Sequence, residues 1–377
     1  MESVLGRATL VFADFELFRG CCDNPMMKAL VVSFLFMLGF LPSCRAQATT
    51  PVPDLATPQE KHLRHVRQLT FGGSNAEAYF SADGQKLIFQ STRDNLQCDQ
   101  EFTMNVDGSD VRMISNGKGR TTCGFFYPNG KTVLYSSTYL TDEQCPPRPD
   151  YSKGYVWGIY PGYEIFTANP DGSGLIQLTN SPGYDAEATI SKDGKKIVFT
   201  STRNGDLDIY TMDSDGRHVK QLTHELGYDG GPVFSPNRKL VVYRAYHPVS
   251  EKEIGEYKEL LTQNLIRPTS LELWLMKADG GKKRQITHLG AASFGPAFSP
   301  NGKRIIFASN QGSTGGMGNF ELYSVDLKGR HLEQITYSPG FDGFPMFSAD
   351  GKKLVWASNR NAKAPHETNI FIADWVP

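Results

Sequence analysis

The sequence lacks an excess of positive charge. Its 377 residues include 39 Lys and Arg against 40 Asp and Glu. Proteins that bind nucleic acid, or that lie on an anionic membrane through charge alone, need a surplus of cationic side chains. The composition therefore excludes nucleic acid as a principal partner.

The sequence also lacks the common signatures of catalysis. It contains no Gly-x-Ser-x-Gly pentapeptide, no His-Glu-x-x-His pair, no Gly-x-x-x-x-Gly-Lys-Ser/Thr loop and no dinucleotide fingerprint. Serine hydrolysis, zinc proteolysis and nucleotide chemistry are therefore unsupported. Whether the chain is an enzyme of another kind stays open at this point, with a non-catalytic role favoured.

No apolar run is long enough to span a bilayer, but one near the N-terminus is typical of an export signal. In residues 28–48, Lys28 is followed by an uncharged apolar run. Cleavage after Ala48 fits the small-residue pattern of ordinary signals. Lipidation of Cys44 is the alternative, because the residues before it resemble a lipoprotein signal. We favour cleavage after Ala48 and expect a location in the periplasm or outer cell envelope, where membrane attachment would require lipidated Cys44.

Prolines separate this segment from the rest of the chain. We expect an N-terminal extension and export signal over 1–48, an extended linker over 49–60, and one folded domain over 61–377. Glycine is abundant, at 37 residues, and aromatic residues make up 11%. Many tight turns together with large packed side chains are typical of an all-β fold.

The folded part consists of six copies of one pattern. In the clearest copy, a Leu-Thr pair lies at 178–179, a Ser-Lys-Asp-Gly turn at 191–194, and apolar runs at 197–199 and 208–210. Asp-Gly and Asn-Gly sequences favour the positive φ of tight hairpins. Arg238 takes the place of glycine in the fourth copy. The turn recurs at 81–84, 127–130, 191–194, 235–238, 299–302 and 348–351.

Each copy predicts four antiparallel strands, because apolar β-forming runs alternate with turns. Four-stranded units repeated in this way are typical of propeller blades. The last copy ends after its third strand, whereas residues 66–70 form a fourth strand with no others before it. We therefore expect an all-β, six-bladed β-propeller of four-stranded antiparallel blades, with the N-terminal strand completing the last blade.

These motifs resemble those of a known family. The patterns Leu-Thr, Phe-Ser-x-Asp-Gly-Lys, Ser-x-Arg and Ile-Tyr-x-Met-Asp are similar to the WD40-like repeats of the TolB propeller family, over about residues 61–377. The resemblance implies a six-bladed propeller that is exported to the bacterial periplasm and serves as an interaction module.

Long connections between the second and third strands interrupt two of the copies. They span 138–162 and 245–270, and a glycine-rich extension spans 312–318. In a propeller these connections lie on one face, which also carries the mouth of the central channel. The first insertion contains Trp157 and Tyr160, which we expect to contact a bound partner.

Two further features concern these connections. Apolar residues at near-helical spacing over 251–265 predict a short helix that packs on the rim. Cys98 and Cys145 lie in connections of adjacent blades and are candidates for a disulfide. Cys123 belongs to an innermost strand, where we expect a small buried residue rather than a nucleophile.

Acidic residues recur at the start of the innermost strands. We expect them to surround the channel mouth and to attract a basic peptide segment. Glu77, Asp185, Asp229 and Asp342 are candidate oxygen ligands for calcium. The alternative is that the Asp and Asn side chains only cap turns through local hydrogen bonds. The aligned positions hold Asn75, Glu77, Asp185, Glu187, Asp229 and Asp342.

The sequence thus predicts an exported propeller that binds a protein or peptide through its loop-rich face and channel mouth. An envelope lipoprotein is one candidate partner, no cofactor is required, and the chain is expected to be a monomer. The alternative is a calcium-dependent, lactonase-like hydrolase in which channel-mouth carboxylates hold the ion that polarises a carbonyl. A third interpretation, a purely structural surface protein, leaves the mouth empty.

Overall fold

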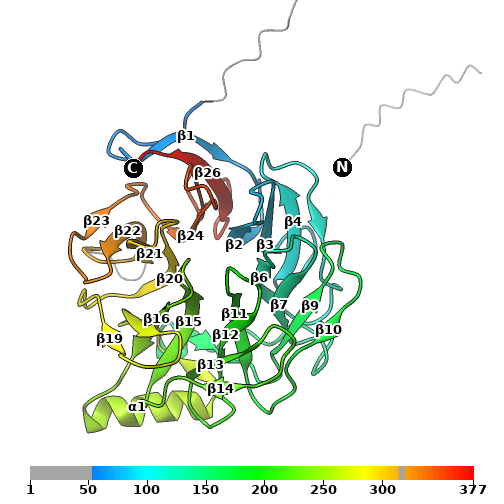
Figure 1. Ribbon diagram of the computed structural model, residues 1–377, viewed down its shortest axis with the longest axis vertical. Coiled ribbons are helices and arrows are strands. Elements are labelled where there is room, and N and C mark those ends of the chain that lie inside the picture. Colours follow the sequence, from blue (N-terminus) through cyan, green and yellow to red (C-terminus); the bar gives the residue numbers. More distant parts are fainter. Residues whose placement is uncertain (1–52, 314–318) are drawn as a thin grey trace, which may run out of the picture. The chain divides into compact units, whose positions relative to one another are not determined.

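Six four-stranded antiparallel sheets are arranged around a common axis, so the chain forms a six-bladed β-propeller (Figure 1). The computed structural model describes residues 53–313 and 319–377. The expected export signal, with its alternatives at Cys44 and Ala48, lies outside the described residues, as does most of the glycine-rich extension. The predicted fold class is confirmed.

Blades 1 to 3 follow the chain from the innermost strand outward. In each of them the fourth strand has only two residues, which limits the exposed sheet edge. Blade 1 contains β2 (Ser74–Phe80), β3 (Lys86–Thr92), β4 (Gln100–Asn105) and β5 (Arg112–Met113). Blade 2 contains β6 (Thr121–Phe126), β7 (Val133–Ser137), β9 (Glu164–Ala168) and β10 (Ile176–Gln177). Blade 3 contains β11 (Asp185–Ile190), β12 (Lys196–Ser201), β13 (Asp208–Asp213) and β14 (Lys220–Gln221).

Blades 4 and 5 repeat this order, and blade 6 takes its fourth strand from the start of the chain. Blade 4 contains β15 (Tyr228–Phe234), β16 (Leu240–Tyr246), β18 (Glu272–Lys277) and β19 (Arg284–Gln285). Blade 5 contains β20 (Ser293–Phe298), β21 (Arg304–Ser309), β22 (Glu321–Asp326) and β23 (Glu333–Gln334). Blade 6 contains β24 (Asp342–Phe347), β25 (Lys353–Ser358), β26 (Asn369–Trp375) and β1 (Leu63–Gln68).

The ring closes because the first strand joins the last blade. β1 pairs antiparallel with β26, with Gln68 opposite Phe371, and the two lie side by side in blue and red in Figure 1. The Thr70 hydroxyl accepts a hydrogen bond from the N–H of Ile370 and donates one to the side chain of Asn369. Closure pairs two strand edges that would otherwise be exposed. The predicted contribution of the N-terminal strand is confirmed.

The Leu-Thr and Ile-Thr pairs of the repeat tie the fourth strand to the third. The Thr179 hydroxyl accepts a 2.8 Å hydrogen bond from the N–H of Ile165. The Thr336 hydroxyl bonds Leu322 in the same way and donates to the carboxylate of Glu321. These bonds supplement the few backbone bonds that a two-residue strand can make. The equivalent residues are Thr70, Ser115, Thr179, Thr223, Thr287 and Thr336.

The core lies mainly between neighbouring blades. Phe80, Phe89 and Met104 of blade 1 pack with Val355 and Ile370 of blade 6. Phe89 is fully buried, and burying a side chain of this size contributes about 1.5–3 kcal/mol. Because each blade covers a face of the next, the ring stabilises blades that could not bury their faces alone.

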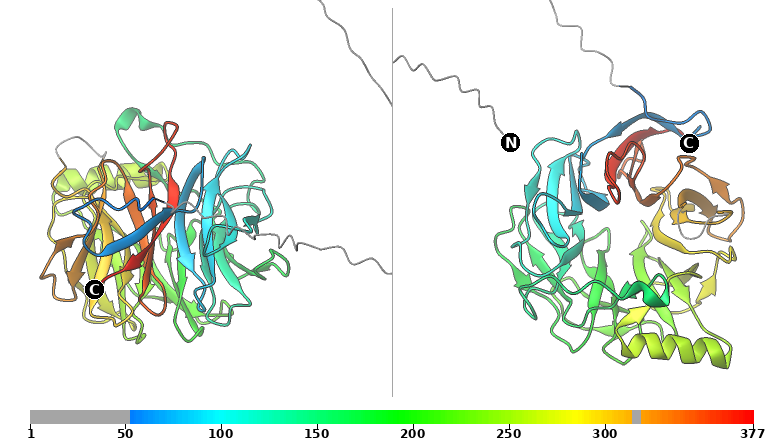
Figure 2. Two further views of the ribbon diagram at one scale, coloured as in Figure 1. Left: turned by 90° about the horizontal axis from the view of Figure 1, so that it is seen from above. Right: turned by 180° about the vertical axis from the view of Figure 1, so that it is seen from behind.

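The two long insertions meet each other. β8 (Trp157–Gly158) from the insertion of blade 2 pairs antiparallel with β17 (Leu265–Ile266) from the insertion of blade 4. The N–H of Ile159 also donates to the carbonyl of Asn264. We call this two-stranded bridge the strap. It links blades that are not neighbours in the ring, and Figure 2 (right) views the molecule from the face that carries the insertions.

The insertion of blade 4 also contains the helix α1 (Glu251–Thr262). Ser250 and Glu253 form a reciprocal capping box at its start, and Tyr257 and Leu260 are buried. Figure 2 (left) shows α1 on the same face of the ring as the loop near residue 150, which contains the short helix η1 (Tyr151–Lys153). The predicted helix is confirmed. Within the described residues, no helix is long and apolar enough to cross a bilayer.

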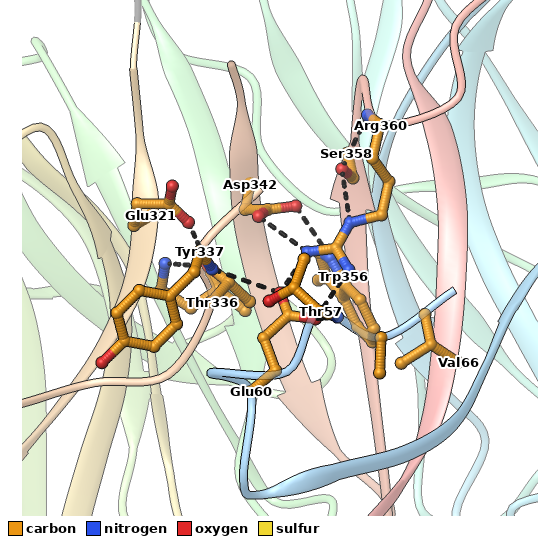
Figure 3. A network of polar contacts seen from close by, with 12 residues as sticks. Thr57, Glu60, Val66, Glu321, Thr336, Tyr337, Asp342, Trp356, Ser358 and Arg360 are labelled. Atoms are coloured by element: carbon orange, nitrogen blue, oxygen red, sulfur yellow. Dashed lines mark hydrogen bonds and ion pairs between the residues drawn. The ribbon is translucent and has the colours of Figure 1, made fainter. Parts of the chain in front are cut away.

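Residues 54–60 lie against the last blade instead of forming a free linker. The Asp54 carboxylate accepts hydrogen bonds from backbone N–H groups of the first strand. Glu60 is only 1% exposed and forms an ion pair with Arg360 (Figure 3). The folded body therefore starts upstream of the boundary that proline content indicated.

Candidate functional site

Each innermost strand has a bulge at the same place. Its pairing with the second strand shifts register in all six blades. The residue at the bulge has a positive φ of 52° to 59°. A bulge redirects one side chain of a strand, and here the six bulge residues all line one cavity. They are Glu77, Cys123, Glu187, Gly231, Gly295 and Phe344.

This cavity at the channel mouth has a volume of about 560 Å³, which is within the usual range of ligand pockets. One side of its wall is polar, because blades 1 to 3 contribute Glu77, Cys123 and Glu187. The bulge positions of blades 4 to 6 are apolar, with two glycines and Phe344, whose ring packs against Phe294 at 5.2 Å. Arg244 of blade 4 also lines the cavity and pairs with Glu187 on the polar side. The cavity is therefore suited to a ligand group with an apolar body and a polar end.

The strap places aromatic side chains at this cavity. The ring of Trp157 meets Phe294 edge-on at 6.2 Å and lies beneath the guanidinium of Arg244 at 5.3 Å. The ring of Tyr160 lies beneath the guanidinium of Arg120 at 5.6 Å. Both Trp157 and Tyr160 line the cavity. The first insertion thus shapes the channel mouth.

Glu187 has a full set of partners. It forms an ion pair with Arg244 of blade 4 and accepts hydrogen bonds from the Thr200 hydroxyl at 2.8 Å and the Gly231 N–H at 2.9 Å. Burial opposes the charge of Arg244, but the adjacent Glu187 outweighs it and raises the pKa of the guanidinium. A Cβ atom at Gly231 would overlap this guanidinium, so glycine at this bulge makes room for the pair.

Glu77 occupies the equivalent place in blade 1 without such partners. Its carboxylate is near the Tyr79 hydroxyl at 3.4 Å and the Cys123 thiol at 3.8 Å. Burial, and then repulsion by Glu187, raise the pKa of Glu77 to about 7. Within the described residues, no Lys, Arg or His forms an ion pair with it. Arg244, which is paired with Glu187, opposes this rise in pKa from a longer distance. Glu77 is therefore a carboxylate in the cavity wall without an ion pair of its own.

Cys123 is the free cysteine of the described residues and lies beside Glu77 in the cavity wall. Burial, and then the charge of Glu77, raise the pKa of its thiol well above the ordinary value. A nucleophilic cysteine needs the thiolate form. The surroundings of Cys123 disfavour that form.

The structure does not bring Asp185 and Asp229 to the cavity, and this corrects the expected carboxylate ring. Both are buried within their own blades, at 1% and 0% exposure. Asp185 accepts hydrogen bonds from Arg203 at 2.9 and 3.0 Å, and Asp229 bonds His247 at 3.0 Å. Each side chain is directed to a residue that follows the second strand of the same blade.

Asp342 and Asn75 are corrected in the same way. Asp342 is fully buried and accepts hydrogen bonds from Arg360 at 2.9 Å and from the Trp356 indole at 3.0 Å. The amide of Asn75 donates to the carbonyl of Thr368 at 2.7 Å, so it links blade 1 to blade 6. These hydrogen bonds join separate strands and blades, so they are structural contacts but not the local turn caps that the alternative expected.

The expected calcium ligands are consequently not gathered at one place. Of Glu77, Asp185, Asp229 and Asp342, only Glu77 lines the cavity. Within residues 53–313 and 319–377, no group of three or more His, Cys, Asp or Glu side chains is placed to hold a metal ion. Asp185, Asp229 and Asp342 each have at least one oxygen bonded to a side chain of their own blade, namely Arg203, His247 and Arg360, which a metal ion would have to displace.

A disulfide joins Cys98 and Cys145, whose Cα atoms are 5.8 Å apart. Cys98 precedes the third strand of blade 1 and is buried, whereas Cys145 belongs to the insertion of blade 2. The bond thus attaches the first insertion to the adjacent blade near the cavity.

Several residues that line the cavity were not expected from the sequence, among them Tyr79, Tyr184, Tyr228 and Arg244. Alignment of the repeats could have singled out Arg244, because the fourth copy has a cationic residue at a position where the other copies have small or amide side chains. The equivalent residues, opposite the bulge, are Gln90, Ser136, Thr200, Arg244, Ala308 and Ala357.

Comparison with known proteins agrees with this architecture. The family model of the TolB beta propeller domain matches residues 160–266 and 266–366. A structure assigned to TolB from Agrobacterium tumefaciens is similar with a TM-score of 0.53 at 17% identity, covering 81% of this chain and 91% of that chain. The structure of TolB from Acinetobacter baumannii is similar with a TM-score of 0.53 at 16% identity, covering 81% of this chain and 64% of that chain. The structure of an oligogalacturonate lyase from Vibrio parahaemolyticus is similar with a TM-score of 0.50 at 15% identity, covering 83% of this chain and 93% of that chain. At these identities the likeness concerns the fold.

Proposed function

Because the chain belongs to the TolB β-propeller family, we propose that it is a protein- or peptide-binding module of the cell envelope that holds its partner at the channel mouth. The observation that carries this proposal is the strap, which joins two insertions beside a cavity of about 560 Å³ and adds aromatic side chains to its wall. In repeat proteins, insertions are frequently built onto the binding face.

The exposed aromatic residues of the first insertion support a macromolecular partner. Tyr151 and Tyr155 both line the cavity entrance and are 53% and 45% exposed. Tyrosine and tryptophan are enriched where protein interfaces gain most of their binding energy. An extended segment of a partner could enter the cavity while its flanks contact these tyrosines.

The disulfide supports a location outside the cytoplasm. Disulfides such as Cys98–Cys145 persist in oxidising compartments such as the periplasm. The expected export signal over 28–48 agrees with this location. The envelope is therefore the compartment in which a partner should be sought.

The hydrolase alternative has weaker support. Three of its four candidate calcium ligands bond to Arg203, His247 and Arg360. The likeness to an oligogalacturonate lyase is a likeness of fold, and a fold alone does not carry a reaction. We therefore propose binding without catalysis.

Site-specific photo-crosslinking in cells tests the proposal. A photoreactive amino acid replaces Tyr151 at the cavity entrance, and a control protein carries it at Asn301, which is exposed in a hairpin turn on the opposite face. We expect crosslinks to a defined envelope protein or peptide from position 151 that are absent from position 301.

Equal labelling from both positions, or no adduct from position 151 or from a second probe at Tyr155, would contradict binding at the channel mouth. Turnover of a substrate that is lost when Glu77 becomes Gln would instead favour a catalytic role for the cavity.

A further inference from the structure

The contrast between Glu77 and Glu187 carries an inference that rests on the proposed binding function and deepens it. Both lie at the bulge of an innermost strand and line the same cavity. Glu187 forms an ion pair with Arg244, whereas Glu77 forms no ion pair among the described residues and is attracted to Arg244 only from a longer distance. We propose that the cavity takes a cationic side chain of the partner, a lysine or an arginine, with Glu77 as its counter-ion.

The charges of the cavity wall support a cation. The five charged lining residues are Glu77, Asp99, Arg120, Glu187 and Arg244. Arg244 pairs with Glu187, and the Nε of Arg120 is 3.6 Å from an oxygen of Asp99. Glu77 alone is left without a partner of opposite sign, so the ionised cavity has a net charge that one incoming cation would balance.

The surroundings of Glu77 are suited to an ammonium or guanidinium group. The Tyr79 ring stacks on Phe125 at 4.2 Å, and its hydroxyl lies beside the carboxylate. Tyr184 also lines this cavity. Aromatic rings attract cations through their faces, and the attraction grows when water is excluded.

The ionisation of Glu77 is coupled to such a ligand. Burial and the repulsion by Glu187 raise its pKa to about 7 in the free protein. A cation within a few ångströms favours the charged carboxylate. Binding should therefore ionise Glu77 and lower its pKa, so the ligand supplies the counter-charge that the fold leaves out.

The opposite side of the cavity accommodates the stem of the side chain. Phe344 and Phe294 form an apolar wall across from the carboxylates. The methylenes of lysine and arginine pack on apolar surface while the charged end reaches a polar group. An acidic partner fits less well, because Arg120 and Arg244 are already paired.

Selection from a random peptide library displayed on phage tests this inference with the full chain and two variants. Glu77→Gln removes the charge and keeps the shape of the side chain. Glu164→Gln is the matched control, since Glu164 is a buried glutamate with a pKa also raised to about 7 by burial, and it does not line the cavity. We expect enrichment of Lys or Arg at one position with the native chain and the control, and its loss with Glu77→Gln.

A selected peptide then provides a double-mutant cycle. Replacing its Lys or Arg by norleucine should weaken binding to the native chain roughly tenfold or more. The same replacement should have little effect on Glu77→Gln, because the counter-ion is already missing. Thermal unfolding of each variant verifies that the propeller is intact.

The outcomes separate this inference from the proposed function. Peptides that bind at the cavity but show no preference for a cation, or a preference for Asp and Glu, would overturn the role of Glu77 and leave the binding module standing. A cation effect that is the same in the native chain and in Glu77→Gln would overturn it as well. The absence of any enriched peptide would count against both.

Discussion

Arg360 forms a two-pronged ion pair with Glu60, with nitrogen to oxygen distances of 2.8 and 3.2 Å across 300 residues of sequence. The same guanidinium bonds Asp342 at the start of the innermost strand of blade 6 (Figure 3). All three side chains are buried. The segment that precedes β1 is therefore attached to the blade that β1 completes.

Glu60→Gln should lower the free energy of unfolding by about 2 kcal/mol, because a buried cation loses one of its two carboxylates. Glu333→Gln is the control, since Glu333 pairs with Lys61 and His62 at a more exposed site and should cost less than about 1 kcal/mol. Urea unfolding measures both. Equal losses of unfolding free energy in the two variants would show that the buried ion pair of Glu60 stabilises the fold no more than an exposed one.

Glu101→Gln should remove part of the pH dependence of stability. Burial, and then the charge of Glu77, raise the pKa of Glu101 well above the ordinary value, while one oxygen accepts a 3.0 Å bond from the N–H of Gly124. In the unfolded chain a glutamate titrates near pH 4.3. Protonated Glu101 therefore contributes its full share to the free energy of unfolding below that pH. This contribution is lost as the pH rises toward the pKa of Glu101 in the folded protein.

The measurement compares unfolding free energies of the native chain and Glu101→Gln between about pH 5 and 8. The variant should gain relative stability as the pH rises. Glu143→Gln, at an exposed pair with Lys118, should follow the native curve. A constant difference between Glu101→Gln and the native chain would contradict a protonated Glu101.

Gly231→Ala should displace Arg244 from Glu187, because the added Cβ would overlap the guanidinium. Breaking a buried ion pair costs about 3–5 kcal/mol. The strain of placing alanine at a positive φ adds to this cost. Gly295→Ala isolates the second cost, since Gly295 has the same φ of 58° and its Cβ would meet Phe344 instead of a charge. Similar losses of stability in both variants would refute the role assigned to Gly231.

Replacing both Cys98 and Cys145 by serine should lower stability by about 2–4 kcal/mol, as expected for a closed loop of this size. The sequence separation is 47 residues. A reducing agent should destabilise the native chain but not the double variant. Cys123→Ser removes the free thiol and is the control. If reduction leaves the thermal midpoint of the native chain unchanged, the bond contributes nothing to stability.

Calcium should not stabilise the propeller, because Asp185 and Asp342 are bonded to arginine side chains and Asp229 to His247. A ligand at a hundred times its Kd would stabilise the fold by about 2.7 kcal/mol. Thermal unfolding with calcium and with a chelator measures this directly. A calcium-dependent rise in Tm that disappears in Asp185→Asn would restore the metal site.

The blade repeat could be predicted because its determinants are local. A Ser-x-Asp-Gly turn makes its own hydrogen bonds, as Ser81 does to Asp83 at 2.6 Å. Arg238 adopts the glycine conformation with a φ of 62° and keeps the fourth turn intact. Ring closure followed from counting strands at the two ends of the chain. Repeat alignment placed Glu77 and Glu187 at the channel mouth, and the length of the first insertion pointed to Trp157 and Tyr160; all four line the cavity.

Tertiary structure decided which carboxylates are free. Asp185 and Glu187 are two residues apart in one strand, yet the bulge directs only Glu187 to the cavity, because one extra residue changes the face to which a side chain points. Asp185, Asp229 and Asp342 each bond a residue 18 positions later, whereas Glu60 and its partner Arg360 are 300 residues apart. Ion pairs depend on separations of a few ångströms, and only the closed ring sets those separations for residues so far apart in the chain.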